Sequence, residues 1–240
     1  MKRAVVIGAS SGMGMEISKL LLADGWTIGI AARRADKLMA FKELNPDRIE
    51  FETIDVTTDD APDCLLSLID RIGGMDLFFY ASGIGKQNRN LDTDIEIKTV
   101  ATNGLGFTRM IDAAFNYMAN NGGGHIACIS SIAGIKGLGP APSYSATKAF
   151  QNCYIQALEQ LANQRHLSIT FTDIRPGFVD TALLSGAHKY PMLMNVEYVS
   201  RKIYSAVMRQ KHICVIDWRW SILARLWSCV PNFIWRKLNL

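Results

Sequence analysis

Hydrophobic and polar positions along this chain alternate between two patterns. Short apolar runs rich in Val, Ile and Phe are typical of buried strands, and the segments between them carry apolar residues at helical spacing. Strands are expected at residues 4–7, 26–32, 48–53, 76–81, 126–129, 168–174 and 212–216, and helices at 15–25, 35–43, 63–72, 93–120, 143–164 and 195–210. Strands that alternate with helices in this way predict an α/β fold with a parallel sheet.

The composition allows one such domain and narrows its class. The 240 residues are 49% hydrophobic, which is enough for a substantial core, and we expect residues 1–217 to form a single domain. A formal charge of +4, without a basic groove that carries aromatic residues, does not indicate nucleic acid. The five cysteines lack the spacing of metal ligands or of a disulfide framework, so no metal is expected and a reducing cytoplasm is the expected compartment.

A group of polar residues follows the fifth expected strand. Ser130 and Ser131 lie where the apolar run 126–129 stops, and a loop rich in Gly and Pro leads to a helix that carries Tyr144 and Lys148. Tyr144 and Lys148 are four positions apart and therefore share one helix face, and the loop is long enough to bring Ser131 back against Tyr144. A hydroxyl, a phenol and an ammonium in one cleft suggest proton transfer to a carbonyl oxygen.

A glycine-rich loop joins the first expected strand to the first expected helix. Glycines let the backbone turn tightly and approach a diphosphate, which the free N–H groups and the positive end of the helix dipole then stabilise. The strand–loop–helix context favours a dinucleotide site over an ordinary glycine-rich turn. The loop residues assigned to the cofactor are Gly8, Ser10, Ser11, Gly12, Met13 and Gly14.

The second expected strand ends in Arg33 and Arg34. Dinucleotide folds that prefer NAD usually place an acidic residue there to hold the ribose hydroxyls. Two guanidinium groups suit a ribose 2′-phosphate instead, which predicts NADP(H) in preference to NAD(H). The alternative is an ordinary solvated pair at the start of the helix 35–43. Asp55, after the third strand, is placed either to accept a hydrogen bond from an adenine amino group or simply to form a turn.

Other segments add candidate residues for the cofactor and the substrate site. Ser82 and Gly83 follow the fourth strand and residues 175–181 follow the sixth, at the edge where ligands of parallel sheets collect. Asn103 lies among apolar positions of the helix 93–120, and it is either structural or holds a water in the cleft, because a buried amide needs partners at both ends. Residues 182–194, with His188 expected to be exposed, either close over an apolar substrate or pack in the core.

The tail, residues 218–240, differs in composition from the rest. Four of the five Trp residues lie there with Arg and Lys side chains, and Pro231 should divide the tail into two helices. Tryptophan with basic residues on an apolar helix is the composition of an interfacial membrane anchor, and no charge-free run approaches the roughly 20 residues that a span requires. The alternative is an arm that packs against a partner subunit or folds over the substrate pocket.

Taken together, the glycine loop 8–14, Asp55, Asn103, Ser131 and the Tyr144-x-x-x-Lys148 motif resemble the short-chain dehydrogenase/reductase family over residues 2–216. The resemblance implies a Rossmann-like, doubly wound sheet of seven parallel strands with helices on both faces. It also implies homodimers or homotetramers built on the two longest helices. The tail falls outside the resemblance and is described as a separate amphipathic arm.

The resemblance also assigns roles to individual residues. Tyr144 becomes the acid in reduction and the base in oxidation, and Lys148 favours its phenolate and binds the nicotinamide ribose. Ser131 hydrogen-bonds the substrate oxygen, and Asn103 positions a water that leads protons to Lys148. Thr181 is the candidate for fixing the reactive face of the ring. The other cofactor contacts assigned are Val56, Ala81, Ser82, Gly83, Pro176, Gly177 and Val179.

The function expected on this basis is an NADP(H)-dependent oxidoreductase that transfers hydride between nicotinamide and a carbonyl or alcohol carbon. The substrate is expected to be apolar. If the tail is a membrane anchor, the substrate is also expected to be lipid-like and the protein to lie at the inner face of a membrane. A non-catalytic NADP(H)-binding sensor or scaffold is the alternative, because Ile7 and the Ala81-Ser82-Gly83 loop depart from the usual family residues. The complete set of Ser131, Tyr144 and Lys148 argues against it.

Overall fold

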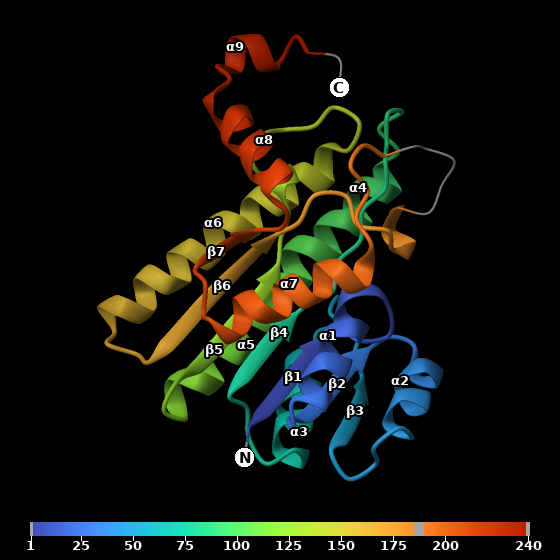
Figure 1. The fold of residues 1–240 in the computed structure, drawn as a ribbon, viewed down its shortest axis with the longest axis vertical. Helices are drawn as coiled ribbons and strands as arrows, with labels where there is room; N and C mark the ends of the chain where they lie inside the picture. Colours follow the sequence, from blue (N-terminus) through green and yellow to red (C-terminus); the bar gives the residue numbers. More distant parts are fainter. Residues whose placement is uncertain (1, 185–189, 239–240) are drawn as a thin grey trace.

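The strands of this protein form one parallel sheet with helices on both faces (Figure 1). The computed structural model describes residues 2–184 and 190–238. In this part of the chain the strand order is β3-β2-β1-β4-β5-β6-β7, so the expected α/β fold with seven parallel strands is confirmed. The strands are β1 (Arg3–Ile7), β2 (Thr27–Ala32), β3 (Ile49–Thr53), β4 (Leu77–Tyr80), β5 (Gly124–Ile129), β6 (Ile169–Arg175) and β7 (Ile213–Val215).

Two groups of helices cover the two faces of the sheet (Figure 1). One face carries α1 (Gly12–Ala23), α2 (Ala35–Lys42) and α7 (Val196–Met208), and the other carries α3 (Ala61–Arg71), α5 (Phe107–Asn120) and α6 (Pro142–Gln164). Successive side chains of a strand point to opposite faces, and a parallel sheet buries both of them. In β1, therefore, Val5 and Ile7 join the core cluster under α3, α5 and α6, while Ala4 and Val6 join the cluster on the opposite face.

The helix expected at residues 93–120 is interrupted at the position of Asn103. It consists of α4 (Thr93–Val100), a π-helical turn η1 (Ala101–Gly106) and α5, which follow one another without a loop. A π-turn adds a residue to a helical turn and often marks a functional position. The interruption places Asn103 beside the loop that follows β4.

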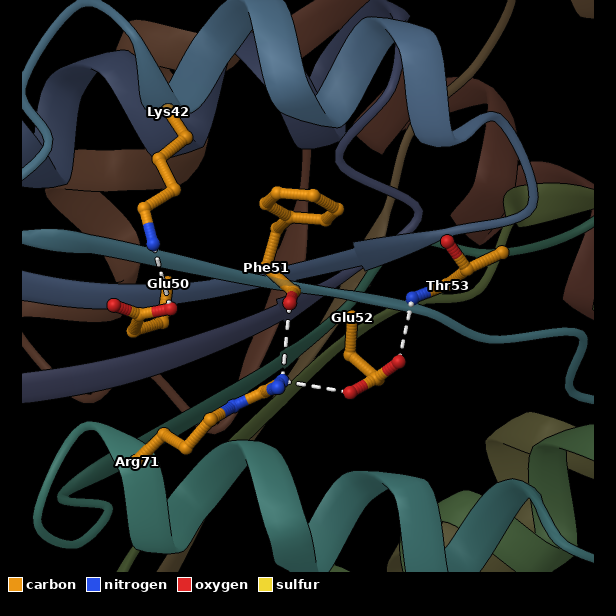
Figure 2. A network of polar contacts seen from close by, with 6 residues as sticks. All are labelled: Lys42, Glu50, Phe51, Glu52, Thr53 and Arg71. Atoms are coloured by element: carbon orange, nitrogen blue, oxygen red, sulfur yellow. Dashed lines mark hydrogen bonds and ion pairs between the residues drawn. The ribbon is translucent and has the colours of Figure 1, made fainter.

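The edge strand β3 is held by one helix on each side (Figure 2). Lys42, the last residue of α2, forms an ion pair with Glu50 at 2.8 Å. Arg71, the last residue of α3, contacts the Glu52 carboxylate at 2.7 Å and donates to the Phe51 carbonyl at 3.0 Å. Each half-exposed pair of this kind stabilises the fold by only about 0–1 kcal/mol. Charged side chains on an edge strand also discourage pairing with a strand of another molecule.

The C-terminal arm is divided at Pro231 as expected, into α8 (Trp218–Cys229) and α9 (Asn232–Trp235). Figure 1 shows both helices at the end of the molecule where α6 begins. Trp220 is only 1% exposed and belongs to the core cluster that underlies α1 and α7. Its indole lies directly on Gly177, where a Cβ atom would overlap the ring. Of the described helices, none is both long enough and apolar enough to cross a membrane.

Candidate active site

The strand order places a crevice at the carboxyl ends of β1 and β4. Successive strands extend in one direction from β1 to β3 and in the other from β4 to β7, so the loops after β1 and β4 diverge. Ligands of open parallel sheets bind at such a switch point. The predicted site residues lie in the loops at this edge and in the helices that start there or pass beside it.

Ser131, Tyr144 and Lys148 converge beyond the end of β5. Ser131 caps the 3₁₀ turn η2 (Ile132–Gly134) by accepting a hydrogen bond from the Ala133 N–H at 3.1 Å, and it also hydrogen-bonds the Tyr144 side chain. The Lys148 Nζ lies 5.8 Å from the centre of the Tyr144 ring. On the other side, a Cβ at Gly85 would come within 2.7 Å of the Tyr144 ring, so a glycine is needed for this approach. The three groups meet as their spacing predicted, while their catalytic roles stay a prediction.

Burial changes the acidity of both titratable groups in this set. Lys148 is 4% exposed, and burial lowers its pKa to about 8, although Cys128 and Asp173 act in the opposite direction. Burial raises the pKa of the Tyr144 phenol, and the hydrogen bond with Ser131 only partly opposes this. In the protein without cofactor, desolvation of the phenol is thus the largest influence on the pKa of Tyr144, and the expected effect of Lys148 and the nicotinamide charge on the phenolate stays a prediction. A phenol that keeps its proton suits an acid in reduction.

Asn103 is fully buried, and its amide is used at both ends. The side-chain oxygen accepts from the Ile84 N–H at 2.9 Å, and the side-chain nitrogen donates to the Ile84 carbonyl at 2.7 Å. These bonds hold the loop after β4, which agrees with the structural interpretation of this residue. The side chain of Gln151 joins the Asn103 carbonyl to Lys148, and the expected water-mediated path stays a prediction.

Gln151 was missed by reasoning from the sequence. Its amide donates to the Asn103 carbonyl at 2.8 Å and accepts from Lys148 Nζ at 2.8 Å. A signal was available, since Gln151 follows Lys148 by three positions and therefore lies on the same helix face. The contact with Asn103 had no such signal, because the two residues are far apart in the chain.

The glycine loop after β1 packs directly on the loop after β4. Gly8 has a φ of +88°, and a Cβ there would lie 2.8 Å from the backbone of Ala81 and Ser82. A Cβ at Gly14 would overlap the carbonyl oxygen of Gly8. Neither position has room for a side chain, so this part of the loop presents only backbone to a ligand.

Two further glycines connect this loop to the rest of the site. Gly12, at a φ of +55°, approaches the Thr181 side chain so closely that a Cβ would lie 3.4 Å from it. A Cβ at Gly83 would lie 3.3 Å from Asn103 Oδ1 and 3.8 Å from Lys148 Nζ. The residues predicted after β1, β4 and β6 thus lie next to one another and next to Lys148.

Arg34 lies against the glycine loop. Its guanidinium donates to the Ser10 hydroxyl at 2.9 Å and to the Ser11 hydroxyl at 2.6 Å. Ser11 begins α1 without a side-chain cap, and the first turn of α1 has no acidic residue. The helix start and the guanidinium therefore present positive electrostatic potential to the same space, which fits a phosphorylated dinucleotide. Arg33 and Arg34 are both exposed, but these hydrogen bonds hold Arg34 on the loop; a contact of either guanidinium with a 2′-phosphate stays a prediction.

Asp55 forms a turn in this structure. Its Oδ1 accepts from the Thr57 N–H at 3.0 Å and from the Thr57 hydroxyl at 2.7 Å. Burial alone would raise the pKa of Asp55, but these hydrogen bonds and the charge of Arg33 outweigh it and lower the pKa. The turn-forming alternative is what the hydrogen bonds support, and a contact with adenine stays a prediction.

Some predicted cofactor contacts have their side chains in the core. Val56 and Val179 are each 4% exposed, so only their backbone groups remain for a cofactor. Val179 pairs with Met194 in a single β-bridge, which closes the base of the segment between them. Gly177 lies under Trp220, and Pro176 accepts a long hydrogen bond of 3.5 Å from the Ser131 hydroxyl.

The segment 182–194 is partly buried and partly exposed in the described residues. Met194 is 4% exposed, and the Tyr190 ring packs on Phe178 with 4.8 Å between centroids. Leu183 and Leu193 are 39% and 47% exposed. His188 lies outside the described residues. The base of the segment therefore packs in the core, and its role as a lid stays a prediction.

A hollow of about 390 Å³ lies beside the face of α6 that carries Tyr144 and Lys148. Its walls are the loop 134–139 and the side chains of α6 that face this loop, which lie next to the face of Tyr144 and Lys148 rather than on it. The arm holds this loop: Trp235 Nε1 donates to the Gly137 carbonyl at 2.7 Å, and Lys136 Nζ donates to the Asn232 side chain at 2.8 Å. The arm thus contacts the segment that begins at Ser131.

The fold and the site define a dinucleotide-dependent oxidoreductase, and comparison with known proteins gives its family. The model of the family described as short chain dehydrogenase matches residues 2–190. The chain belongs to the short chain dehydrogenase family and is a nicotinamide-dependent enzyme of that class.

Several curated relatives are oxidoreductases of bacteria. An uncharacterized oxidoreductase of Mycobacterium tuberculosis (strain ATCC 25618 / H37Rv) is 27% identical over 246 residues, which cover 98% of this chain and 96% of the relative. One of Myxococcus xanthus (strain DK1622) is 28% identical over 96% of this chain and 93% of its own. One of Staphylococcus aureus (strain MW2) is 31% identical over 76% of this chain and 80% of its own.

Solved structures show the same fold. A structure described as "ElxO with NADP Bound" superposes with a TM-score of 0.81 at 21% identity, covering 92% of this chain and 99% of that chain. A second structure, of an ElxO variant described as "with NADPH Bound", gives the same values.

Proposed function

We propose that this protein is an NADP(H)-dependent reductase of carbonyl groups in apolar, lipid-like compounds, and that it also catalyses the reverse oxidation of the alcohols. The observation that carries the proposal is the convergence of Ser131, Tyr144 and Lys148 beyond β5, with burial keeping the phenol protonated. This is the arrangement that protonation of a carbonyl oxygen requires.

The residues of the crevice fit the cofactor at three places. The glycine loop 8–14 and the start of α1 would hold its diphosphate, and Arg34 would hold the ribose 2′-phosphate. Lys148 and the loops after β4 and β6 would hold its nicotinamide half. When bound, the nicotinamide supplies or accepts the hydride at the carbon that carries the oxygen. NADP in the structures of similar fold supports this choice of cofactor.

The side chains of this chain perform the proton transfer. The Tyr144 hydroxyl donates its proton to the substrate oxygen, and the Ser131 hydroxyl donates a hydrogen bond to the same oxygen as negative charge develops there. The Lys148 ammonium then stabilises the phenolate that remains, because an opposite charge nearby favours the charged form. Below a pH of about 8 Lys148 is charged and can act in this way.

An apolar substrate is supported by the side chains around the crevice. Leu183 and Leu193, in the segment that follows the β6 loop, are 39% and 47% exposed, and Ile135 and Leu138 line the hollow after Ser131. Exposed apolar side chains grouped around a site are typical of binding surfaces for apolar ligands.

We also propose that the arm contacts a membrane surface. Of the 26 Lys and Arg residues, four lie in residues 218–240, where there is no Asp or Glu; the rest of the chain has 22 of each sign. The arm therefore carries the whole net charge of +4. It also exposes large apolar side chains, namely Trp218, Ile222, Leu226, Phe233, Ile234 and Leu238. Basic and apolar groups together favour an anionic bilayer surface.

A homo-oligomer is proposed through the helices α4 to α6. Ile97, Val100, Leu105 and Phe150 are each at least 41% exposed on this side of the molecule. Covering such apolar side chains with a second copy of the chain would remove them from water. Sedimentation velocity of the full chain measures this directly, and a monomer at micromolar concentration would contradict it.

The variant Tyr144→Phe tests the proposed function. Loss of the phenolic proton should lower kcat for NADPH-dependent reduction of apolar ketones by about 10²–10⁴. NADPH affinity should change by less than about threefold, because the ring is retained. Tyr198→Phe, an exposed position on α7, is the matched control. If Tyr144→Phe keeps most of its activity, or if the unmodified protein reduces no member of a broad panel, the reductase proposal fails and a cofactor-dependent sensor is favoured.

A further inference from the structure

Gln151 is a fully buried amide between two parts of the candidate site. It lies on α6, one turn after Lys148, and none of its surface is exposed. A buried amide is costly unless its oxygen and nitrogen are both hydrogen-bonded. Here the oxygen accepts from Lys148 Nζ and the nitrogen donates to the Asn103 carbonyl, each at 2.8 Å. The side chain therefore bridges α6 and the π-turn.

We propose that Gln151 is a positioning residue that fixes the Lys148 ammonium for the proposed reaction and couples it to the π-turn η1. The catalytic consequence of this inference rests on the proposed function, whereas the contact of Gln151 with Lys148 does not depend on that function. The side-chain amide of Asn103, in the π-turn, holds the Ile84 loop. Through Gln151, the position of Lys148 depends on the same turn.

The π-turn makes this bridge possible. Asn103 lies inside the turn, and its carbonyl accepts a hydrogen bond from another helix. In a regular helix, carbonyls are directed along the axis to an N–H one turn later. Where a π-turn loosens this pattern, a carbonyl becomes accessible to an outside donor, and such turns are frequent at functional sites.

Neutral acceptors surround the Lys148 ammonium. Besides Gln151, its second acceptor is the Ile129 carbonyl at 3.1 Å. The charged or titratable groups nearest to it are Tyr144 on α6, Cys128 on β5 and Asp173 on β6. The Asp173 carboxylate is already bound by the Ser130 hydroxyl and by Arg175 at 2.7 Å. Lys148 is thus held by dipoles, and removal of one of them should change both its position and its protonation.

Two substitutions of Gln151 test this with a titration that needs no turnover. Gln151→Met keeps the length of the side chain and removes both hydrogen bonds, and Gln151→Glu replaces the neutral acceptor with a carboxylate. The titration of Lys148 is followed by NMR of ¹³C-labelled lysine in the protein without added nucleotide, with Lys148→Arg to assign the signal. Gln156→Met, exposed on the same helix, is the matched control.

The two substitutions should shift the titration in opposite directions. In Gln151→Met the midpoint should fall by about one to two pH units, because a buried ammonium loses a hydrogen bond. In Gln151→Glu it should rise by at least about one unit, because an opposite charge lies beside it. The pH above which turnover declines should move in the same direction, and kcat should change more than KM in Gln151→Met.

Three results separate the possible failures. If the midpoint of the Lys148 titration in Gln151→Met stays within a few tenths of a pH unit of that in the unmodified protein while the melting temperature falls, Gln151 is only structural. The proposal is then overturned. If Gln151→Met does not fold, Gln151→Glu alone decides, and an unshifted midpoint there also overturns the proposal. If both midpoints shift but the unmodified protein has no reductase activity, the positioning of Lys148 stands and the proposed function fails.

Discussion

At the scale of single residues, burial decides the protonation of the candidate site. It raises the pKa of Tyr144 and lowers that of Lys148 to about 8, so each shift favours the neutral form of its group. At neutral pH the phenol keeps its proton, and the ammonium still keeps its charge. Both are needed if Tyr144 gives up a proton and Lys148 stabilises the phenolate that remains.

Arg34 is the residue on which the choice of cofactor should depend. Its guanidinium lies on the Ser10 and Ser11 hydroxyls, at the position expected for a 2′-phosphate. Arg34→Ala should weaken NADPH binding by about 10–100-fold, since a charge-assisted contact is lost, and should change NADH binding by less than about threefold. Fluorescence titration with both nucleotides measures this, and Arg209→Ala, exposed at the end of α7, is the control. Equal weakening of both nucleotides would contradict the assignment.

His125 should make the fold sensitive to acid. It is 7% exposed, its Nε2 lies 2.8 Å from the Thr172 hydroxyl, and burial lowers its pKa from 6.5 to about 4. Between these two values the unfolded chain binds a proton that the folded chain does not. The free energy of unfolding therefore falls as the pH drops from about 6.5 to about 4, by at most about 3 kcal/mol from this residue.

The variant His125→Gln isolates this contribution. Urea unfolding at pH 7 and at pH 4 should show that the variant loses less stability on acidification than the unmodified protein does. His166→Asn is a suitable control, because His166 is exposed and has a φ of +54°, a conformation that Asn tolerates. Parallel pH dependence of the unmodified protein and His125→Gln would show that burial of this imidazole does not account for the loss.

At the scale of elements, the π-turn organises one side of the site. It places the Asn103 amide on the Ile84 loop, and the Asn103 carbonyl on Gln151. At its C-terminal end, Gly106 packs on Val56, where a Cβ would lie 2.7 Å from the Val56 side chain and 2.8 Å from its carbonyl oxygen. The turn thus contacts the Ile84 loop and Gln151 on one side and the Val56 backbone on the other.

Two glycines of the same turn provide a matched pair of substitutions. Gly106→Ala should lower the free energy of unfolding by about 1–3 kcal/mol, because the new methyl group overlaps the Val56 backbone. Gly104→Ala should be neutral or slightly stabilising, because its nearest neighbour would be 3.9 Å away and Ala favours helix over Gly. Thermal unfolding of both variants checks this. Similar melting temperatures would show that the contact at Gly106 is relieved by a small shift of the turn.

At the scale of the whole molecule, the arm joins the sheet domain to the candidate site. Trp220 inserts into the core over Gly177, and Trp235 and Asn232 hold the loop that begins after Ser131. Deletion of residues 218–240 would therefore remove a core side chain together with the exposed apolar surface. Substitutions on the exposed side of the arm separate these two effects.

The proposed membrane contact can be tested with Phe233→Ser combined with Ile234→Ser. These side chains are 62% and 43% exposed, so the fold should be preserved while the apolar surface is lost. The full chain should sediment with vesicles of phosphatidylglycerol and phosphatidylcholine, less so at high salt, and the double variant should bind at least about tenfold more weakly. Leu44→Ser, 68% exposed after α2, is the control. Absence of binding by the full chain would favour an arm that packs on a partner subunit.

Local signals in the chain were sufficient for the elements and for much of the site. Apolar periodicity separates strands from helices because side chains alternate every two residues in a strand and every 3.6 in a helix. Pro231 divides the arm because proline lacks the N–H of a continuing helix. Tyr144 and Lys148 share a face because they are four positions apart. All of these features depend on neighbours along the chain, so they can be predicted from the amino-acid sequence.

Long-range packing accounts for the rest. Gln151 meets the Asn103 carbonyl across a separation of 48 positions, and Trp220 meets Gly177 only once α8 docks on the sheet. Arg34, and not Arg33, hydrogen-bonds the glycine loop, and this too depends on which groups fold around it. The same is true of the raised pKa of Tyr144 and the lowered pKa of Lys148. Burial and hydrogen bonding between distant segments set these properties, and no local pattern of residue types encodes them.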